Sequence, residues 1–248
     1  MKSFVKKIIS FFGYDIKRIN QSLSFDDIYL SFFKNDAIIF DVGANKGQSI
    51  ERFKKIFPNS IIHAFEPIKE EFDLLKTTYD ADVNVKLSNI AVGDKVEKKK
   101  LNIAKRTGVS SFNEFNKETD WIKTRSKEYN TNVDDFITGN QIVDINTLDN
   151  YVLENNISNI DILKIDTQGY EDKVLLGCKN SLSKKIIKAV ELEIIFDNTY
   201  DRYLTFSEIE KYLLPNYRFV GIKNYNQNLF EGINFFAEVL YINKKLLK

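Results

Sequence analysis

The chain has 248 residues, with 36 Lys and Arg against 35 Asp and Glu, so its formal net charge is +1. This balance disfavours a nucleic-acid binder, which needs a net basic face, and a hydrophobic content of 43% disfavours wholesale disorder. One cysteine, Cys178, and one histidine, His63, exclude a disulfide framework and Cys- or His-rich metal sites. We expect a cytoplasmic protein.

The first residues predict an amphipathic helix. Apolar side chains between Phe4 and Phe12 share one helical stripe beside Lys6 and Lys7. Apolar runs stay below the ~20 residues of a transmembrane helix, and a signal-peptide cleavage site is missing. We expect residues 1–35 to form a helical extension on a domain of residues 36–248. In the alternatives, residues 3–19 contact a membrane surface peripherally or form a homodimer.

Strands and helices alternate along the rest of the chain. Apolar runs predict strands over residues 37–42, 60–65, 83–92, 160–165 and 186–196. Helical spacing predicts helices over residues 48–57, 69–79, 147–154, 170–176 and 206–214. Two last strands, 217–222 and 235–242, lack a helix between them and predict an antiparallel pair. The fold class is therefore α/β with a doubly wound, mostly parallel sheet, whose ligands lie beyond the carboxyl ends of the strands.

The stretch between the third and fourth of these strands is harder to assign. Residues 96–111 predict one or two short strands around Arg106, Thr107 and Gly108. Residues 113–140 are polar and contain the isolated Trp121. A loop of this length in a compact domain is usually a lid, a binding loop or a disordered segment.

A glycine-containing turn follows the first strand, and it reads Asp41-Val-Gly43-Ala-Asn45-Lys-Gly47. Glycine and asparagine tolerate positive φ, so this turn lets a ligand approach backbone N–H groups at a helix N-terminus. A dinucleotide fingerprint would need a third glycine where Gln48 stands. The pattern fits a loop that binds S-adenosylmethionine (SAM) better, because an acid at Asp41 suits the ammonium of its amino-acid tail.

Polar residues also end the second and third strands. Glu66 comes directly after an apolar run and before Pro67, where a carboxylate can accept both ribose hydroxyls of a nucleoside. Alternatively, Glu66 is a glutamate on the protein surface without a role in binding. Asn89 could bond the edge of an adenine that Ala91 helps to line.

Acidic residues mark the next two strands. Asp166 follows the buried run of residues 160–165 and would face the reaction centre, unless it only caps the following helix. Glu191 and Glu193 fall on one face of an apolar strand. They indicate a functional strand end, unless Lys164 or Lys188 pairs with them.

Taken in order, these motifs resemble the FkbM family of SAM-dependent methyltransferases. The segments that carry the resemblance are DVGANKG, FEP, SSF, TLDNY, LKIDTQGYEDKVLLG and VELEI, within residues 37–242. The resemblance implies a class I methyltransferase-like (Rossmann-like) sheet of seven strands with an antiparallel last strand. It also implies O-methylation with SAM as cofactor, with a small-molecule or glycan acceptor, because many members act on sugars or glycans.

For single residues, the resemblance implies a SAM loop at Asp41, Gly43, Asn45 and Gly47, and a ribose acid at Glu66. It places an adenine contact near Asn89 and Ala91. Asp166 and Glu193 match acidic positions that face the substrate, and Glu238 matches an acid before the last apolar strand.

One carboxylate is enough to take the proton from an acceptor hydroxyl. We therefore expect Asp166 to be the base and Glu193 to orient the acceptor. In an alternative, Asp166 with Glu191 or Glu193 binds Mg²⁺. Further candidates for acceptor contacts are Lys164, Tyr200, Arg202 and Trp121. The rival functions are an NAD-dependent oxidoreductase and a non-catalytic module that binds SAM or a nucleotide.

Overall fold

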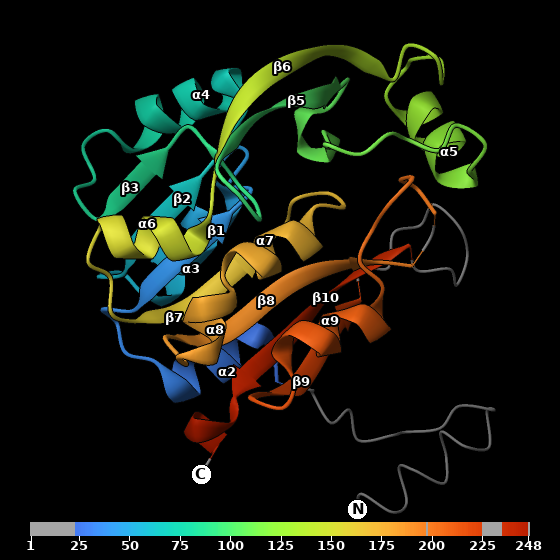
Figure 1. The fold of residues 1–248 in the computed structure, drawn as a ribbon. Helices are drawn as coiled ribbons and strands as arrows, with labels where there is room; N and C mark the ends of the chain where they lie inside the picture. Colours follow the sequence, from blue (N-terminus) through green and yellow to red (C-terminus); the bar gives the residue numbers. More distant parts are fainter. Residues whose placement is uncertain (1–22, 197, 225–234, 248) are drawn as a thin grey trace, which may run out of the picture.

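A computed structural model describes residues 23–196, 198–224 and 235–247. Its centre is a seven-stranded sheet in the order β3-β2-β1-β7-β8-β10-β9 (Figure 1). The strands are β1 Ile38–Val42, β2 Ile61–Phe65, β3 Val85–Ser88, β7 Ile160–Ile165, β8 Ile187–Ile195, β9 Tyr217–Asn224 and β10 Phe236–Asn243. Neighbours from β3 to β8 pair in parallel, and β10 pairs antiparallel with β8 and β9. This order confirms the predicted class I methyltransferase-like fold.

Helices cover both faces of this sheet, which explains its continuous apolar strands. On one face lie α2 Phe25–Phe32, α3 Gln48–Ile56 and α4 Lys69–Tyr79. On the other face lie α6 Leu148–Glu154, α7 Glu171–Gly177, α8 Lys179–Ser183 and α9 Phe206–Leu213. Every residue of β7 is buried between the two layers, so this strand is held at the middle of the core.

Helix α2 belongs to the core of the domain. A capping box between Ser24 and Asp27 starts the helix. Its Phe25, Ile28 and Tyr29 pack in one cluster with α3 and the sheet. Residues 3–19, predicted as an amphipathic helix, lie outside the described residues. Among the helices that are described, none has the length and apolar character to cross a membrane.

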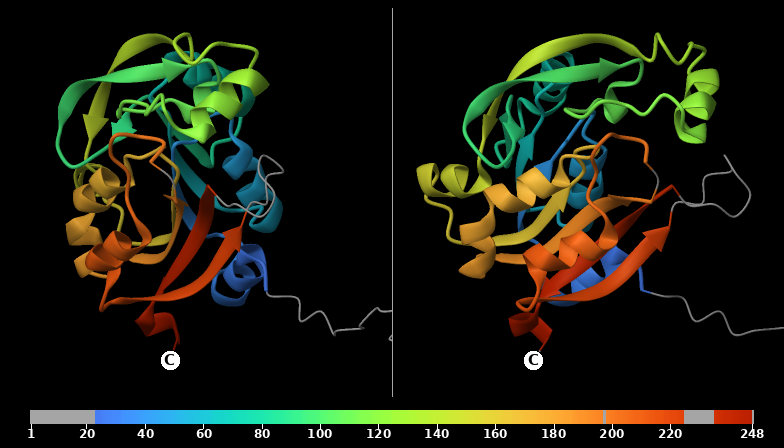
Figure 2. Two further views of the ribbon diagram at one scale, coloured as in Figure 1. Left: turned by 90° about the vertical axis from the view of Figure 1, so that its right-hand side faces the viewer. Right: turned by 45° about the vertical axis from the view of Figure 1, so that its right-hand side comes forward.

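A second sheet, in the order β4-β6-β5, lies at one end of the large sheet (Figure 2). Its strands are β4 Ala91–Val92, β5 Glu97–Ala104 and β6 Ile137–Asn146. The single strand expected over residues 83–92 is thus two strands in different sheets, because the chain turns at Asn89 and Ile90. We refer to residues 97–146 as the cap.

The cap has a small core of its own. Between β5 and β6 lie a short 3₁₀ turn, η1 Thr107–Val109, and the helix α5 Asp120–Glu128. The side chains of Trp121, Ile122 and Phe136 are buried together beside Ala104. Residues 113–140 are therefore folded over the strand ends, in the position of the lid that was one of the three expectations.

Candidate functional site

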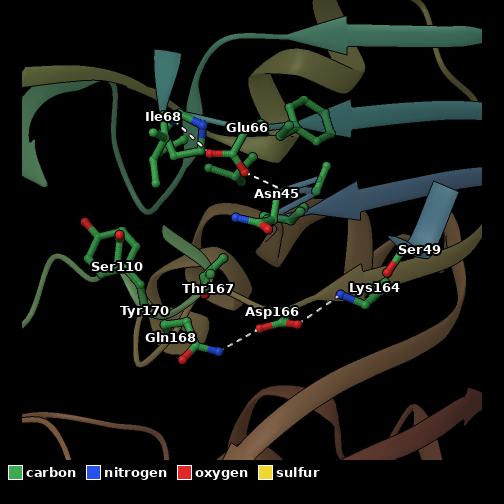
Figure 3. A pocket seen from close by; sticks show the side chains of 18 of the residues that line it. Asn45, Ser49, Glu66, Ile68, Ser110, Lys164, Asp166, Thr167, Gln168 and Tyr170 are labelled. Atoms are coloured by element: carbon green, nitrogen blue, oxygen red, sulfur yellow. Dashed lines mark hydrogen bonds and ion pairs between the residues drawn. The ribbon is translucent and has the colours of Figure 1, made fainter. Parts of the chain in front are cut away.

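A cavity of about 350 Å³ lies between the strand ends and the cap (Figure 3). Its walls come from the turns after β1, β2 and β7, from β4, and from residues 105–112 of the cap, which we call the strap. Its size falls in the usual range for small-molecule sites. Of the predicted cofactor residues, four line it, namely Gly43, Asn45, Glu66 and Ala91.

The glycine turn after β1 forms the floor of this cavity. Gly43, Asn45 and Gly47 all have positive φ, at 87°, 44° and 87°. The N–H groups of Gly43 and Ala44 both donate to the carbonyl of Phe65, at 3.0 and 3.1 Å. Gly47 lies away from the cavity as the N-cap of α3. The N–H groups of Gly43, Ala44 and Asn45 are therefore paired within the protein, and a ligand contact with this turn stays a prediction.

Glu66 is the buried acceptor of the cavity. Its Oε2 accepts from the N–H of Asn45 at 2.7 Å, and its Oε1 accepts from the N–H of Ile68 at 2.8 Å. Burial raises the pKa of Glu66 to about 7, against the lowering effect of these two hydrogen bonds. Asn89 stabilises the turn after β2, since its Nδ2 donates to the carbonyls of Glu66 and Pro67. It is not among the residues that line the cavity.

Part of the cavity is lined by apolar residues, and we call this part the slot. The residues that line the slot are Ile68, Ile90, Ala91, Leu101, Phe112 and Tyr170. The rings of Phe112 and Tyr170 lie 4.5 Å apart, and the ammonium of Lys99 lies 4.7 Å from the centre of the Tyr170 ring. Aromatic walls of this kind suit a flat ring. Phe112 and Tyr170 lie within the sequence motifs SSF and TQGYE, but the sequence pattern alone assigned neither of them a role in ligand binding.

A row of alternating charges crosses the sheet beneath the glycine turn. Asp41, Lys164 and Glu191 are register neighbours on β1, β7 and β8. The Lys164 ammonium lies 3.7 Å from Asp41 Oδ1 and 3.3 Å from Asp166 Oδ2. Burial opposes the charge of Lys164, but the carboxylates of Asp166 and Asp41 outweigh it and raise its pKa. Lys164 is also one of the residues that line the cavity, whereas Asp41 is fully buried and does not line it.

The environment of Asp41 differs from the sequence expectation. Neither of its oxygens has a hydrogen-bond partner in the described part of the chain. Burial raises the pKa of Asp41 to about 6, and the charge of Lys164 opposes this rise. Lys164 lines the cavity and Asp41 does not, so the structure does not place the Asp41 carboxylate where it would contact a ligand ammonium directly.

Glu191, one of the acids of the alternative magnesium site, is already paired with other side chains. Glu191 accepts from the hydroxyl of Tyr29 at 2.5 Å and from the guanidinium of Arg52 at 2.6 and 3.1 Å. Lys188, another expected partner, instead pairs with Asp161. Across the described ranges, no group of three or more His, Cys, Asp or Glu side chains could hold a metal ion. The magnesium hypothesis is therefore not supported.

The two predicted catalytic acids are brought together by a residue the sequence analysis did not single out. Gln168 donates through Nε2 to Asp166 Oδ1 at 2.9 Å and to Glu193 Oε2 at 2.7 Å. Asp166 is partly exposed and lines the first cavity. Glu193 lines a second, adjoining cavity of about 830 Å³. Burial, and then the charge of Asp166, raise the pKa of Glu193 well above its ordinary value.

The predicted acceptor contacts divide into two groups. Trp121 and Tyr200 both line the second cavity, and the hydroxyl of Tyr200 donates to Gln168 Oε1 at 3.0 Å. Arg202 instead pairs with Asp172 at 2.6 Å and is not among the lining residues of either cavity. Glu238 lines the first cavity and pairs with Lys223.

The strap contributes a further residue that the sequence did not single out for a ligand site. Thr107 donates through Oγ1 to Glu71 on α4 and accepts from Asn45 Nδ2 at 3.4 Å. These contacts hold the strap against both the glycine turn and α4. No periodic signal marks such a contact, because Thr107 and its two partners lie in three distant segments of the chain.

Comparison with known families and proteins gives a consistent picture. The model of the methyltransferase FkbM domain matches residues 41–222. The chain is 24% identical, over 196 residues, to the "2-O-methyltransferase NoeI" of Sinorhizobium fredii, with 76% of this chain and 75% of that protein covered.

Two solved structures are among those that the chain resembles. An rRNA methylase from Streptococcus thermophilus is 11% identical, with 93% of this chain and 99% of that chain covered and a TM-score of 0.47. A fibrillarin from Aeropyrum pernix, determined with natively bound SAM, is 10% identical, with 84% and 67% covered and a TM-score of 0.45.

Proposed function

Because this chain belongs to the methyltransferase FkbM family, we propose that it uses SAM to methylate a sugar hydroxyl in the synthesis of a glycan or surface polysaccharide. The observation that carries the proposal is the junction of two cavities. Four of the predicted cofactor residues line one cavity, two of the predicted acceptor residues line the other, and Gln168 joins Asp166 to Glu193 between them. The proposal includes a cytoplasmic reaction, as the single cysteine predicts.

The first cavity fits SAM in three respects. Gly43 lines the cavity without a side chain, and it has no room for one, since a Cβ there would lie 1.9 Å from the carbonyl oxygen of Asp166. Glu66 offers a buried carboxylate for a ribose diol, and the slot beside Phe112 and Tyr170 offers apolar walls for adenine. When bound, SAM supplies a methyl group activated by a sulfonium.

The two acids suit different tasks. Asp166 is paired with the Lys164 ammonium and partly exposed to the cavity, so it can accept the proton of an acceptor hydroxyl. Glu193, whose pKa burial raises well above its ordinary value, lines the second cavity and can orient the acceptor by hydrogen bonding. The chain otherwise has only to align the hydroxyl with the methyl carbon, at about 3 Å.

The second cavity supports a sugar as the acceptor. The rings of Trp121, Tyr129 and Tyr200 line it together with the carboxylates of Glu70, Glu71 and Glu193. Aromatic faces beside hydrogen-bonding carboxylates match the alternating apolar and hydroxyl faces of a sugar ring. The named 2-O-methyltransferase relative is consistent with this choice.

Two measurements test the proposal. Thermal unfolding is followed with S-adenosylhomocysteine, the demethylated form of SAM, and with NAD as control. At about 100 times its Kd a ligand adds about 2.7 kcal/mol of stability, or roughly 5–10 °C in a domain of this size. Methyl-labelled SAM is then incubated with a panel of free, nucleoside-diphosphate-linked and polymeric sugars.

We expect a shift with S-adenosylhomocysteine alone and label on at least one sugar. A shift with NAD alone would favour the oxidoreductase. A shift with S-adenosylhomocysteine but no label on any sugar would contradict the sugar acceptor and leave the binding module as the better explanation.

A further inference from the structure

Gln168 lies where the two cavities meet. It lines both of them, whereas Asp166 lines only the first and Glu193 only the second. Its side chain contacts both acids to which the proposed function assigns the chemistry, and Figure 3 shows the contact with Asp166. The roles proposed for Asp166 and Glu193 do not by themselves require an amide at position 168.

The orientation of the Gln168 amide is fixed by its neighbours. The NH₂ group donates one hydrogen bond to Asp166 and one to Glu193, at 2.9 and 2.7 Å. The amide oxygen accepts from the hydroxyl of Tyr200 at 3.0 Å. The opposite orientation would place that oxygen against two carboxylates, which have no proton to donate when ionised.

The backbone of Gln168 is held as firmly as its side chain. Its φ is +55°, a left-handed conformation that is uncommon for a residue with a Cβ. The carbonyl of Gln168 accepts from Ser111 Oγ at 2.6 Å. The buried carboxylate of Glu171 accepts from the N–H groups of Thr167 and Gly169, the residues on either side. Such a conformation persists only where its surroundings determine it.

We propose that Gln168 is a positioning residue for methyl transfer, whose amide holds the carboxylates of Asp166 and Glu193 together and keeps Asp166 available as the base. This inference rests on the proposed function. Two carboxylates that share a site disfavour each other's ionisation. The two N–H donors of Gln168 compensate for this, because hydrogen bonds to a carboxylate favour its charged form.

Other charged and titratable groups act on the same pair, and they remain when the amide is removed. They are Lys164, Asp41, Glu171, Glu238 and Tyr200. Lys164 is the cation among them, and it contacts Asp166 Oδ2 but not the oxygen that Gln168 binds. Loss of the amide therefore leaves a carboxylate oxygen of each acid without its donor.

The test replaces Gln168 with methionine, which keeps the length of the side chain and removes the amide. Asn150→Leu is the matched control, since the Asn150 amide also donates to two side-chain oxygens, on Asn146 and Glu154 of the chain around α6. The pH dependence of kcat/KM is measured with labelled SAM and the sugar that the wild type methylates fastest. The carboxyl groups are titrated in parallel by ¹³C NMR, which needs no acceptor.

For Gln168→Met, we expect the acid limb of the pH profile of kcat/KM to move upward by about one pH unit. This is the shift expected for loss of one hydrogen bond to a carboxylate. Affinity for S-adenosylhomocysteine should stay within about twofold, and Asn150→Leu should keep the wild-type profile. Tyr200→Phe removes only the hydrogen bond to the amide oxygen of Gln168. It should move the acid limb of kcat/KM less than Gln168→Met does, and in the same direction. It also serves if Gln168→Met does not fold.

An active Gln168→Met enzyme with an unmoved acid limb overturns the inference and leaves the proposed function intact. If the variant is inactive, the NMR titration decides, because unchanged titration of Asp166 and Glu193 overturns it and an upward shift supports it. If the wild type methylates no sugar, the proposed function fails, and the positioning role in catalysis fails with it.

Discussion

Gly43 packs directly against the backbone of Asp166, so that a Cβ on Gly43 would lie 1.9 Å from the Asp166 carbonyl oxygen. The N–H of Asp166 in turn donates to the carbonyl of Val42 at 3.0 Å. The glycine turn after β1 and the predicted base after β7 are thus fixed to each other through backbone contacts. The position of the reacting groups relative to the cofactor cavity depends on this one close approach.

Substitution of Gly43 by alanine should therefore disturb both parts of the site. Its φ of 87° is unfavourable for alanine, and the clash with a backbone atom cannot be relieved by a rotamer change. We expect a loss of more than about 2 kcal/mol in the free energy of unfolding and no detectable binding of S-adenosylhomocysteine. Chemical denaturation and calorimetry measure the two effects.

Gly139→Ala is the control for that variant, because a Cβ at Gly139 meets no atom within 4 Å. It should change neither stability nor binding. Equal behaviour of the two alanine variants would show that the close approach of Gly43 to Asp166 is unimportant.

Glu66→Gln should weaken cofactor binding in a pH-dependent way. The pKa of Glu66 is raised to about 7 by burial, and the charged form is the better acceptor for ribose hydroxyls. Binding then favours the ionised carboxylate, so the wild-type affinity for S-adenosylhomocysteine should fall as the pH drops below 7. The variant should bind at least about tenfold more weakly at pH 8 and show little change with pH.

Calorimetric titration between pH 5.5 and 8.5 provides the comparison. Glu118→Gln, at an exposed position of the cap, should keep the wild-type curve. A wild-type affinity that is flat across this range would show that Glu66 does not accept from the ligand.

The elements that the sequence predicted well are those with strong local patterns. The apolar run over residues 160–165 matches β7, and the helical spacing over residues 69–79 matches α4. Strand β7 is buried on both faces and α4 packs one side against the sheet, so their hydrophobic patterns report directly on burial. The glycine turn and Glu66 were predictable for a related reason, since strand ends in this fold face the ligand.

The cap was not predictable in the same way. Strand β6 has few apolar residues, and it exists because it pairs with β5, about 40 residues earlier in the chain. The break between β3 and β4 depends on the Asn89 amide, which bonds to the backbone at Glu66 and Pro67. Contacts between distant segments such as these leave no periodic pattern.

The residues at the junction of the two cavities were predicted in part. Asp166 and Glu193 stood out because acids at the ends of apolar strands are unusual. Gln168 did not stand out in the sequence, since a glutamine after a strand is typical of an ordinary turn. Its importance depends on a positive φ and on two side-chain contacts, which only the fold provides. Glu191, singled out with Glu193, is instead the partner of Arg52.

Asp166→Asn should separate catalysis from cofactor binding. Asparagine keeps the shape of the side chain but cannot accept the acceptor's proton at neutral pH. We expect kcat to fall by at least about 100-fold, with the affinity for S-adenosylhomocysteine within about threefold of the wild type. Single-turnover transfer from labelled SAM measures the first quantity. Retention of full turnover would remove Asp166 as the base.

Glu171→Gln should change the pH dependence of stability. Burial raises the pKa of Glu171 to about 7 in the folded protein, above its value of 4.5 when unfolded. The folded state then binds the proton more tightly, so this contribution is present below about pH 4.5 and is lost as the pH rises toward 7. The wild type should lose up to about 3 kcal/mol from this group across that interval, and the variant should lose correspondingly less.

Denaturant unfolding at pH 5 and pH 8 measures this difference. Glu66 and Asp41 have raised pKa values too, and they contribute to both proteins alike, so only the difference between variant and wild type reports on Glu171. An identical change with pH in the two proteins would contradict the assignment.

Thr107→Val should loosen the strap over the cofactor cavity. The hydroxyl of Thr107 joins the strap to Glu71 and to Asn45 of the glycine turn, and valine has the same shape without the hydroxyl. The strap forms one wall of the cavity through Thr107, Gly108 and Phe112, so its opening gives a bound cofactor a way out. We expect S-adenosylhomocysteine to dissociate about tenfold faster, with less change in the association rate.

Stopped-flow or surface-binding kinetics measure both rates. Thr131→Val is the control, because the Thr131 hydroxyl also donates one hydrogen bond within the cap, to the carbonyl of Asp135, and Thr131 lies away from both cavities. It should dissociate at the wild-type rate. If Thr107→Val also does so, the strap is held by its apolar contacts and its hydroxyl bonds have no part in retaining the cofactor.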